Sequence, residues 1–410
     1  MSKDRKKAPG SRLALVVMVF YFLAFLLLAA RDGSTMGYIL AGAVPCMILL
    51  GTNLLPHLFP TDRLLMSLAN FLCGLGVLLL YDTNPAYALQ QAVAYGVGLV
   101  AMIVCIYIVR AMHTGRRIIW LIIPGSLLFL ALPLVLGREI NGARNWIVLG
   151  SFSFQPSEVV KLSLVLVLAY FLSRRRMIPW LGFAVACLGI LLLQKDLGTA
   201  LLYYGTALLL YWAASGNLPL SLIGLAGGVG AAWYGYRTFA HVRLRVALWL
   251  DPWANEAAGH QLLQGFAAIS AGGLWGAGLG LGSPTSIPVY ESDFIFAVLC
   301  EQFGLIFAAC VLLIYAALIW RGTVIAISAR RSFHGLLAMG SVLMIGLQAF
   351  VIIGGVLKLI PLTGVTLPFI SYGGTSLVSN LCLIGLISGV ESLNEADLEE
   401  DARLAMLGRT

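Results

Sequence analysis

Eight acidic residues between positions 139 and 301 are the side chains of this sequence best suited to acid–base chemistry. They are Glu139, Glu158, Asp196, Asp251, Glu256, Glu291, Asp293 and Glu301. Basic residues lie near them in the sequence, namely Arg138, Arg144, Lys161, Lys195, Arg243 and Arg245. A site with both signs of charge suits an anionic substrate and an acid or base that acts on it. The five histidines form no ligand cluster, so the sequence does not predict a zinc site.

The chain that must position these groups is too apolar for a soluble protein. Of its 410 residues, 60% are hydrophobic and 11% are charged, whereas soluble domains carry about 25% charged residues. A backbone in hydrocarbon must satisfy its own hydrogen bonds, so each long apolar run predicts a helix. We therefore expect an all-α polytopic membrane protein. Its roughly twelve spans are 13–30, 37–55, 64–81, 93–110, 118–136, 156–173, 177–194, 197–214, 218–236, 294–320, 334–360 and 375–390.

The distribution of basic residues predicts the orientation of these spans. With the amino terminus inside, the inner segments contain 17 of the 26 Lys and Arg residues. This bias places both termini in the cytoplasm, and it explains the net charge of +8 without a nucleic-acid partner. The eight acidic residues then lie at or near the outer face. Carboxylates beside a bilayer are costly unless they are paired, hydrated or functional, so we expect one outward-facing polar cavity.

Two outer segments, 137–155 and 237–293, are too long to be simple connectors. Loops of such length in compact proteins are usually functional or disordered, and 237–293 contains too many aromatic and aliphatic residues for disorder. A third irregular segment follows residue 360, where prolines and glycines interrupt an apolar stretch. These residues predict a broken or re-entrant outer segment, which is tolerated only beside protein or water; they are Pro361, Gly364, Pro368, Gly373 and Gly374.

Four separated blocks of this sequence resemble the SEDS family, which includes FtsW, RodA and SpoVE. They are GARNWIVLGSFSFQPSEVVK at 142–161, QKDLGTA at 194–200, IPVYESDFIFAVLCEQFG at 287–304 and PLTGVTLPFISYGGTS at 361–376. The resemblance implies a ten-helix core whose large outer loop is 237–293. It thereby divides the chain into a basic amino terminus with two additional helices, a SEDS-like core, and an acidic cytoplasmic tail, at 1–60, 61–392 and 393–410.

The activity implied by the resemblance is glycosyl transfer in the bacterial cytoplasmic membrane. Family members polymerise lipid II: the GlcNAc 4-hydroxyl of one molecule attacks the MurNAc anomeric carbon of another, with inversion, and undecaprenyl pyrophosphate leaves. We accordingly expect a divalent cation, Mg²⁺ or Mn²⁺, and no organic cofactor. The expected partners are lipid II, a class B penicillin-binding protein that cross-links the product, and other membrane proteins of the division or elongation machinery.

Asp293 matches the essential acid of the family, within the segment SDFIF at 292–296. The resemblance implies that it is the general base or part of a metal site. Its local sequence also fits a second interpretation, because an Asp directly before an apolar helix caps the free amides of that helix. The two roles are compatible.

Glu158, Lys161 and Asp196 are further candidates for substrate binding. Glu158 and Lys161 are three residues apart and share a helix face. They form either a polar wall of the cavity, with Lys161 facing phosphate, or an internal ion pair. Asp196 matches another family carboxylate. It either binds polar groups of the substrate or ties two helices together. Lys195 replaces the usual proline of the family here.

Four arginines are candidates for binding the pyrophosphate. Arg245 matches a family arginine ahead of the segment 250–252, and Arg243 lies nearby if this part of the chain is extended. Arg138 and Arg144, in the first outer segment, are weaker candidates. The alternative for each is a solvated loop face.

Two other functions fit parts of the pattern. About twelve spans with charged residues in them also suit a transporter or flippase of the same lipid. Such a protein needs charged groups that are accessible from both sides, whereas the carboxylates here lie on one side. A non-catalytic division scaffold is the third possibility, and it predicts that Asp293 is dispensable.

Overall fold

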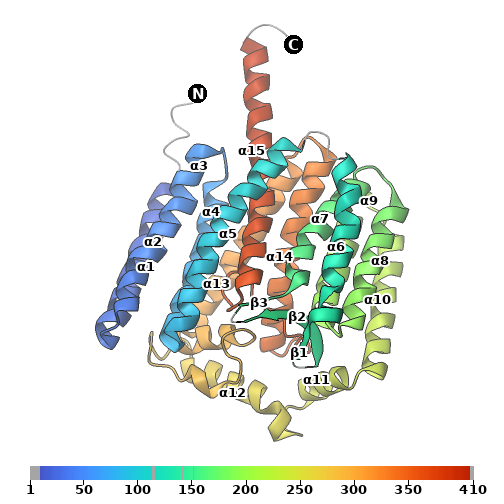
Figure 1. The fold of residues 1–410 in the computed structure, drawn as a ribbon. Coiled ribbons are helices and arrows are strands. Elements are labelled where there is room, and N and C mark those ends of the chain that lie inside the picture. Colours follow the sequence, from blue (N-terminus) through green and yellow to red (C-terminus); the bar gives the residue numbers. More distant parts are fainter. Residues whose placement is uncertain (1–9, 113–115, 141, 151, 407–410) are drawn as a thin grey trace.

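The computed structural model describes residues 10–112, 116–140, 142–150 and 152–406. The basic residues Lys3, Arg5, Lys6 and Lys7, which contribute to the predicted orientation, lie outside the described residues. Long helices run side by side between two ends of the molecule (Figure 1). The first half of the chain contains α1 Gly10–Asp32, α2 Thr35–Leu49, the π-helix η2 Leu50–Leu54, α3 Leu55–Leu58, α4 Arg63–Thr83, α5 Pro85–Ala111, α6 Arg116–Leu136 and α7 Pro156–Leu172. The second half contains α8 Met177–Leu193, α9 Leu197–Ser215, α10 Leu218–Thr238, α11 Ala240–Leu250, α12 Glu256–Gly272, the 3₁₀ helix η3 Pro284–Ser286, α13 Ile295–Ile327, α14 Ser332–Val356 and α15 Gly374–Met406.

The prediction of a helical, multi-span membrane protein is confirmed. Among the described residues, ten helices are long and apolar enough to cross a membrane. Each overlaps one of the expected spans, although the spans expected at 294–320 and 334–360 extend beyond their helices by one and four residues. The remaining two expected spans, 156–173 and 177–194, correspond to α7 and α8, which are 17 residues long each.

The two long outer segments contain more regular structure than the sequence indicated. The sequence predicts that segment 137–155 is more than a simple connector, but it does not predict strands there. The segment forms a small antiparallel sheet in the order β1-β2-β3, from the strands β1 Arg138–Ile140, β2 Ala143–Leu149 and β3 Phe152–Phe154. Segment 237–293 contains the helices α11 and α12. Sheet and helices lie at the end of the molecule opposite the two termini (Figure 1).

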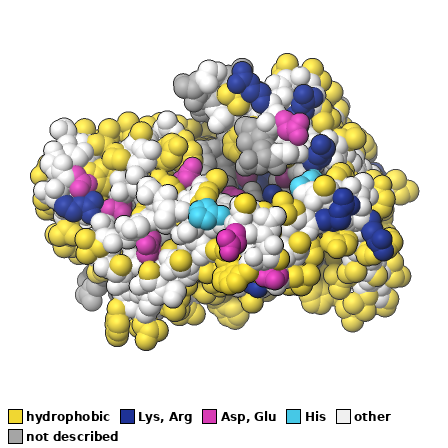
Figure 2. Space-filling view, turned by 90° about the horizontal axis from the view of Figure 1, so that it is seen from below, with side chains coloured by type: hydrophobic (Ala, Val, Ile, Leu, Met, Phe, Trp, Pro, Cys, Tyr) yellow, Lys and Arg dark blue, Asp and Glu magenta, His cyan; other side chains and the backbone are white. Residues whose placement is uncertain are grey.

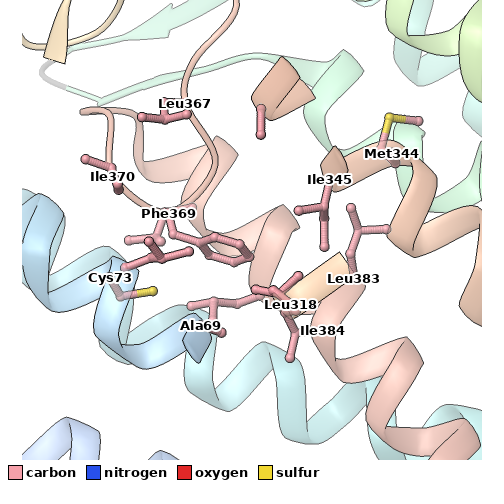
Figure 3. Packing of buried hydrophobic residues seen from close by; sticks show 14 of the residues in the cluster. Ala69, Cys73, Leu318, Met344, Ile345, Leu367, Phe369, Ile370, Leu383 and Ile384 are labelled. Carbon is pink, nitrogen blue, oxygen red and sulfur yellow. The ribbon is translucent and has the colours of Figure 1, made fainter. Parts of the chain in front are cut away.

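The segment 361–373 is not helical, as its prolines and glycines predicted. It enters the bundle, and Leu367, Phe369 and Ile370 are buried among side chains of α4, α13, α14 and α15 (Figure 3). Gly76 of α4 permits this close approach, because a Cβ there would lie 2.5 Å from the carbonyl oxygen of Ile370. The apolar part of the segment therefore anchors it, while its remaining residues reach the sheet end of the molecule.

Candidate functional site

Asp293 lies in the turn that precedes α13. Its amide donates to the carbonyl of Val289, at 3.3 Å, and its carboxylate accepts a hydrogen bond from the Ser292 hydroxyl, at 2.9 Å. The N-cap residue of α13 is Phe294, and the helix has no side-chain cap. The alternative interpretation of Asp293 as a helix cap is therefore not what the structure shows. The half-buried carboxylate instead accepts the Ser292 hydrogen bond and lies beside Gly364.

Arg245 of α11 and Asp293 both lie beside Gly364. A Cβ placed on Gly364 would lie 3.4 Å from Nη2 of Arg245 and 3.6 Å from Oδ2 of Asp293. Nη1 of Arg245 also donates to the carbonyl of Thr363, at 2.7 Å. Gly364 has a φ of +76°, which L side chains rarely adopt. The conformation therefore favours glycine at this position beside the carboxylate and the guanidinium, whereas the space there would accept a Cβ at ordinary contact distances.

The charges of these two side chains influence each other. Burial raises the pKa of Asp293, while the Ser292 hydrogen bond and the positive charge of Arg245 oppose this rise; Glu291 adds to it. Burial lowers the pKa of Arg245, and the charge of Asp293 opposes that change. Asp293 is therefore a stronger base than an exposed aspartate, and Arg245 favours its ionised form.

The segment 361–373 also holds the turn that contains Asp293. The amide of Tyr372 donates to the carbonyl of Glu291, at 2.8 Å, and the Ser371 hydroxyl donates to the carbonyl of Ser292. Thr363 and Gly364, at the other end of the segment, contact Arg245 and Asp293. One non-helical segment thus connects the predicted base and the predicted phosphate-binding arginine.

Asp196 lies at the start of α9 and ties several elements together. Its carboxylate accepts hydrogen bonds from the amide and hydroxyl of Thr199, from Asn145 of β2 at 2.8 Å, and from Gln155 at 3.0 Å. Only 8% of Asp196 is exposed. Of its two predicted roles, the structure shows the tie between elements. The sequence did not identify Asn145 and Gln155 as its partners, because the pairing depends on the sheet.

Lys161 and Glu158 form a buried ion pair of 2.6 Å. Nζ of Lys161 also contacts the side-chain oxygens of Gln348 in α14, at 3.2 Å, and Asn380 in α15, at 3.0 Å. Its three donor positions therefore have three protein acceptors, and 3% of the side chain is exposed. Of the two predicted roles, the structure shows the internal ion pair. Gln348 and Asn380 escaped the sequence analysis, although polar residues inside apolar spans are a signal for such a network.

The other three predicted arginines are exposed and lie apart from this arrangement. Arg243 was expected beside Arg245 on an extended segment, but α11 is a helix. Residues two apart on a helix do not share a face, and Arg243 instead donates to the carbonyl of Arg237, at 2.7 Å. Arg138 lies in β1. Arg144 of β2 donates to the carbonyl of Leu134, at 3.3 Å.

The sheet end of the molecule presents both signs of charge (Figure 2). Acidic and basic side chains occur together on this face, and some are set back in its centre. Within the described part of the chain, no three His, Cys, Asp or Glu side chains are grouped to hold a metal ion. A closed protein cage for a cation is therefore not formed there. The single carboxylate of Asp293 fits the other common arrangement, in which Mg²⁺ is bound by one or two carboxylates together with substrate phosphates.

Comparison with known proteins identifies the family. Residues 75–395 match the family model FTSW_RODA_SPOVE, described as "Cell cycle protein". The chain belongs to this family, also called SEDS, so the resemblance seen in the four sequence blocks is confirmed.

Similar SEDS proteins include "Peptidoglycan glycosyltransferase RodA" of Mycobacterium leprae, which is 33% identical over 361 residues, covering 80% of this chain and 77% of that protein. "Stage V sporulation protein E" of Bacillus subtilis is 34% identical over 358 residues, covering 80% of this chain and 96% of that one.

Solved structures of SEDS proteins share the fold. RodA of Thermus thermophilus superposes with a TM-score of 0.61 at 30% identity, covering 82% of this chain and 98% of that chain. A chain from "Structural coordination of polymerization and crosslinking by a peptidoglycan synthase complex" superposes with a TM-score of 0.68 at 31% identity, with the same coverage.

Proposed function

We propose that this SEDS protein is a peptidoglycan glycosyltransferase that polymerises lipid II during cell elongation or division. The observation that carries the proposal is the placement of Asp293 and Arg245 together beside Gly364, each within 4 Å of the position that a Cβ on this residue would take. A base and a phosphate-binding cation are the two groups that the reaction requires. Their position at the end with the short sheet and α11 suits a substrate whose sugars and phosphates lie at the membrane surface.

In the proposed mechanism, the Asp293 carboxylate accepts the proton of the acceptor GlcNAc 4-hydroxyl as its oxygen attacks the MurNAc anomeric carbon of the donor. The new carbon–oxygen bond forms on the face opposite the departing pyrophosphate, which inverts the configuration. The bond between the anomeric carbon and the phosphate oxygen breaks, and undecaprenyl pyrophosphate leaves with the electron pair. Arg245 stabilises the negative charge that develops on this leaving group.

Asp293 is also the residue proposed to hold a divalent cation, Mg²⁺ or Mn²⁺, together with the substrate pyrophosphate. When bound, such a cation neutralises charge on the phosphates. No organic cofactor is needed for this reaction. Asp196 and the pair Glu158–Lys161 are proposed to hold together the elements that surround the substrate, since their own polar atoms are occupied by protein partners.

The proposed topology has twelve spans, with α7 and α8 as the two shortest, and both termini in the cytoplasm of a bacterial cell. The division into residues 1–60, a core at 61–392 and a tail at 393–410 belongs to the same proposal. The positive-inside bias and the shared position of both termini at one end of the helices support it (Figure 1).

The proposed protein partner is a class B penicillin-binding protein, with other division or elongation membrane proteins. A solved structure similar to this chain belongs to a peptidoglycan synthase complex that coordinates polymerisation and cross-linking. A transpeptidase that uses the glycan strands made by this chain fits that arrangement. The proposed partners do not include a nucleic acid.

The test of this function uses purified full-length protein, alone and with its transpeptidase partner, and labelled lipid II. We expect the wild-type chain to make glycan polymer and Asp293→Ala to make none. Asp251→Asn is the matched control, because Asp251 lies in the same outer region but accepts a hydrogen bond only from the nearby Trp253 amide among its described contacts. It should retain activity within about twofold.

Polymer formation by Asp293→Ala at the wild-type rate would remove Asp293 from the mechanism. Transfer of lipid II between vesicle leaflets without polymer formation would instead support the flippase. Normal growth of cells that contain Asp293→Ala at wild-type protein level would support the non-catalytic scaffold.

A further inference from the structure

The amino-terminal helices α1 and α2 precede the segment matched by the family model, 75–395. They pack against each other, and α1 also packs on α4, with Tyr21, Phe25 and Leu28 fully buried. The opposite side of α1 exposes Leu15, Val16 and Leu23, as expected for a surface in lipid. Apolar packing therefore explains why α1 and α2 associate with the core. It does not explain the polar contacts that α1 makes at its carboxyl-terminal end.

Arg31, in the last turn of α1, contacts two parts of the core. Its Nη2 lies 3.1 Å from Oδ1 of Asp82 near the end of α4, and its Nη1 donates to the carbonyl of Gly280, at 2.7 Å. Its Nε pairs with the neighbouring Asp32. Gly280 has a φ of +76°, and a Cβ there would collide with the Arg31 guanidinium. The positive φ favours glycine at this position, and a larger residue would also displace the Arg31 guanidinium from the loop backbone.

Asp82 connects Arg31 to α13. Its carboxylate is 5% exposed and accepts a hydrogen bond from the Gln302 side chain, at 2.7 Å. A carboxylate buried to this degree needs its partners, because an unpaired charge there would lack water. The contact joins residues 220 positions apart.

The helix that contains Gln302 is broken just after it. Gly304 has non-helical angles, so α13 consists of a short first part, 295–303, and a long second part. The carbonyls of Glu301 and Gln302 accept hydrogen bonds from the amides of Ala277 and Gly278, at 2.8 and 3.0 Å. The outer loop and the first part of α13 are thereby held together, and Asp293 lies two residues before that part.

We propose that Arg31 is a positioning residue for Asp293, the proposed base, and that the amino-terminal helices act as an intramolecular brace. The contacts form a closed ring: Arg31 binds Asp82, Asp82 binds Gln302, the Gln302 carbonyl binds Gly278, and Gly280 of the same loop binds Arg31. The ring fixes the loop and the first part of α13 against α1 and α4. It thereby restricts the motion of the turn that holds Asp293. The inference rests on the proposed role of Asp293.

The test compares Arg31→Gln with wild-type protein in lipid II polymerisation and in amide hydrogen exchange. We expect kcat to fall about tenfold with KM changed by less than about twofold, because the substrate site is intact but the base is less well oriented. Exchange should become faster in 278–282 and 295–303. Arg31→Lys should recover part of the activity, since its ammonium retains the charge and can donate hydrogen bonds, although without the planar fork of Arg.

Asp82→Asn should reproduce the Arg31→Gln effect, and the double variant should be no slower than either single variant, because both changes open the same ring. The control is Arg330→Gln, which breaks the exposed Arg330–Asp401 ion pair at the opposite end of the molecule. It should change neither kcat nor exchange in these segments.

Wild-type kcat in Arg31→Gln would overturn the proposal, whether or not exchange becomes faster. A change confined to KM would also overturn it, because it would indicate a contact with substrate. An equal loss in Arg330→Gln would indicate a general effect of removing ion pairs. The exchange measurement does not depend on activity, so it separates failure of the brace from failure of Asp293 as the base.

Discussion

The environment of the Asp293 carboxylate is formed by groups that lie far from it in the sequence. Arg245 precedes it by 48 positions and Thr363 follows it by 70, yet Arg245 and Asp293 both face Gly364. The sequence identified Asp293 and Arg245 as candidates through the blocks that contain them. It could not separate Arg245 from Arg243, because that distinction requires knowing that residues 240–250 are helical.

The pair predicts a specific pH dependence. In the proposed mechanism Asp293 accepts a proton only when it is ionised. Burial raises its pKa, so the rate should fall as the pH is lowered through this raised pKa. The positive charge of Arg245 opposes the rise. Arg245→Gln should therefore move the acid limb of the kcat/KM profile to higher pH, and lower kcat/KM at neutral pH by about 100-fold through the lost leaving-group stabilisation.

The measurement is the polymerisation rate across a pH series. Arg237→Gln serves as the control, because Arg237 stacks on Trp233 of α10 and should leave the acid limb in place. An acid limb that stays fixed, or moves to lower pH, in Arg245→Gln would contradict the proposed interaction.

The start of α9 packs against segment 361–373 as well as capping its own helix. Asp196 binds the first turn of α9, β2 and Gln155, while Gly198 lies against Thr363, where a Cβ would be 2.9 Å from the carbonyl oxygen. The sequence predicted the helix and the acid at its start. It missed the sheet that supplies Asn145, because strand pairing is decided by contacts between segments and not by local composition.

We expect Asp196→Asn to lower the stability of the protein by about 1–2 kcal/mol. Two of the groups that donate to the carboxylate are side-chain amides, and an Asn amide would place one donor against another. The readout is the midpoint of thermal unfolding in detergent. Asn217→Asp, at the N-cap of α10, is the matched control: its side-chain oxygen still accepts from the Leu220 amide, and its midpoint should not fall. Equal midpoints for both variants would show that the network around Asp196 contributes nothing.

The two ends of the molecule carry different polar segments. The sheet, α11, α12 and the Asp293 turn lie at one end, and the termini and the exposed residues Arg174–Arg176 lie at the other (Figure 1). The positive-inside bias predicts that the arginine end is cytoplasmic. The site would then face the outer surface, where lipid-linked sugars are joined.

Cysteine labelling tests this orientation. In a background without the native cysteines, Trp253→Cys should react with a membrane-impermeant maleimide in intact cells. Arg176→Cys should react only after permeabilisation. Both positions are exposed in the structure, so a difference in labelling reports sidedness. The opposite pattern would place Asp293 in the cytoplasm and exclude the proposed reaction.

The spans and their orientation bias follow from the amino-acid sequence alone, and Asp293 is identified as the candidate base by its match to a family motif. Apolar length and the placement of Lys and Arg act locally along the chain, so each can be evaluated without knowing what packs against it. The choice of Arg245 over Arg243, the closed polar network of Lys161 and the link from Arg31 through Asp82 to Gln302 required the folded chain. Each depends on which elements meet, and that is set by packing among segments that lie 51 to 220 positions apart.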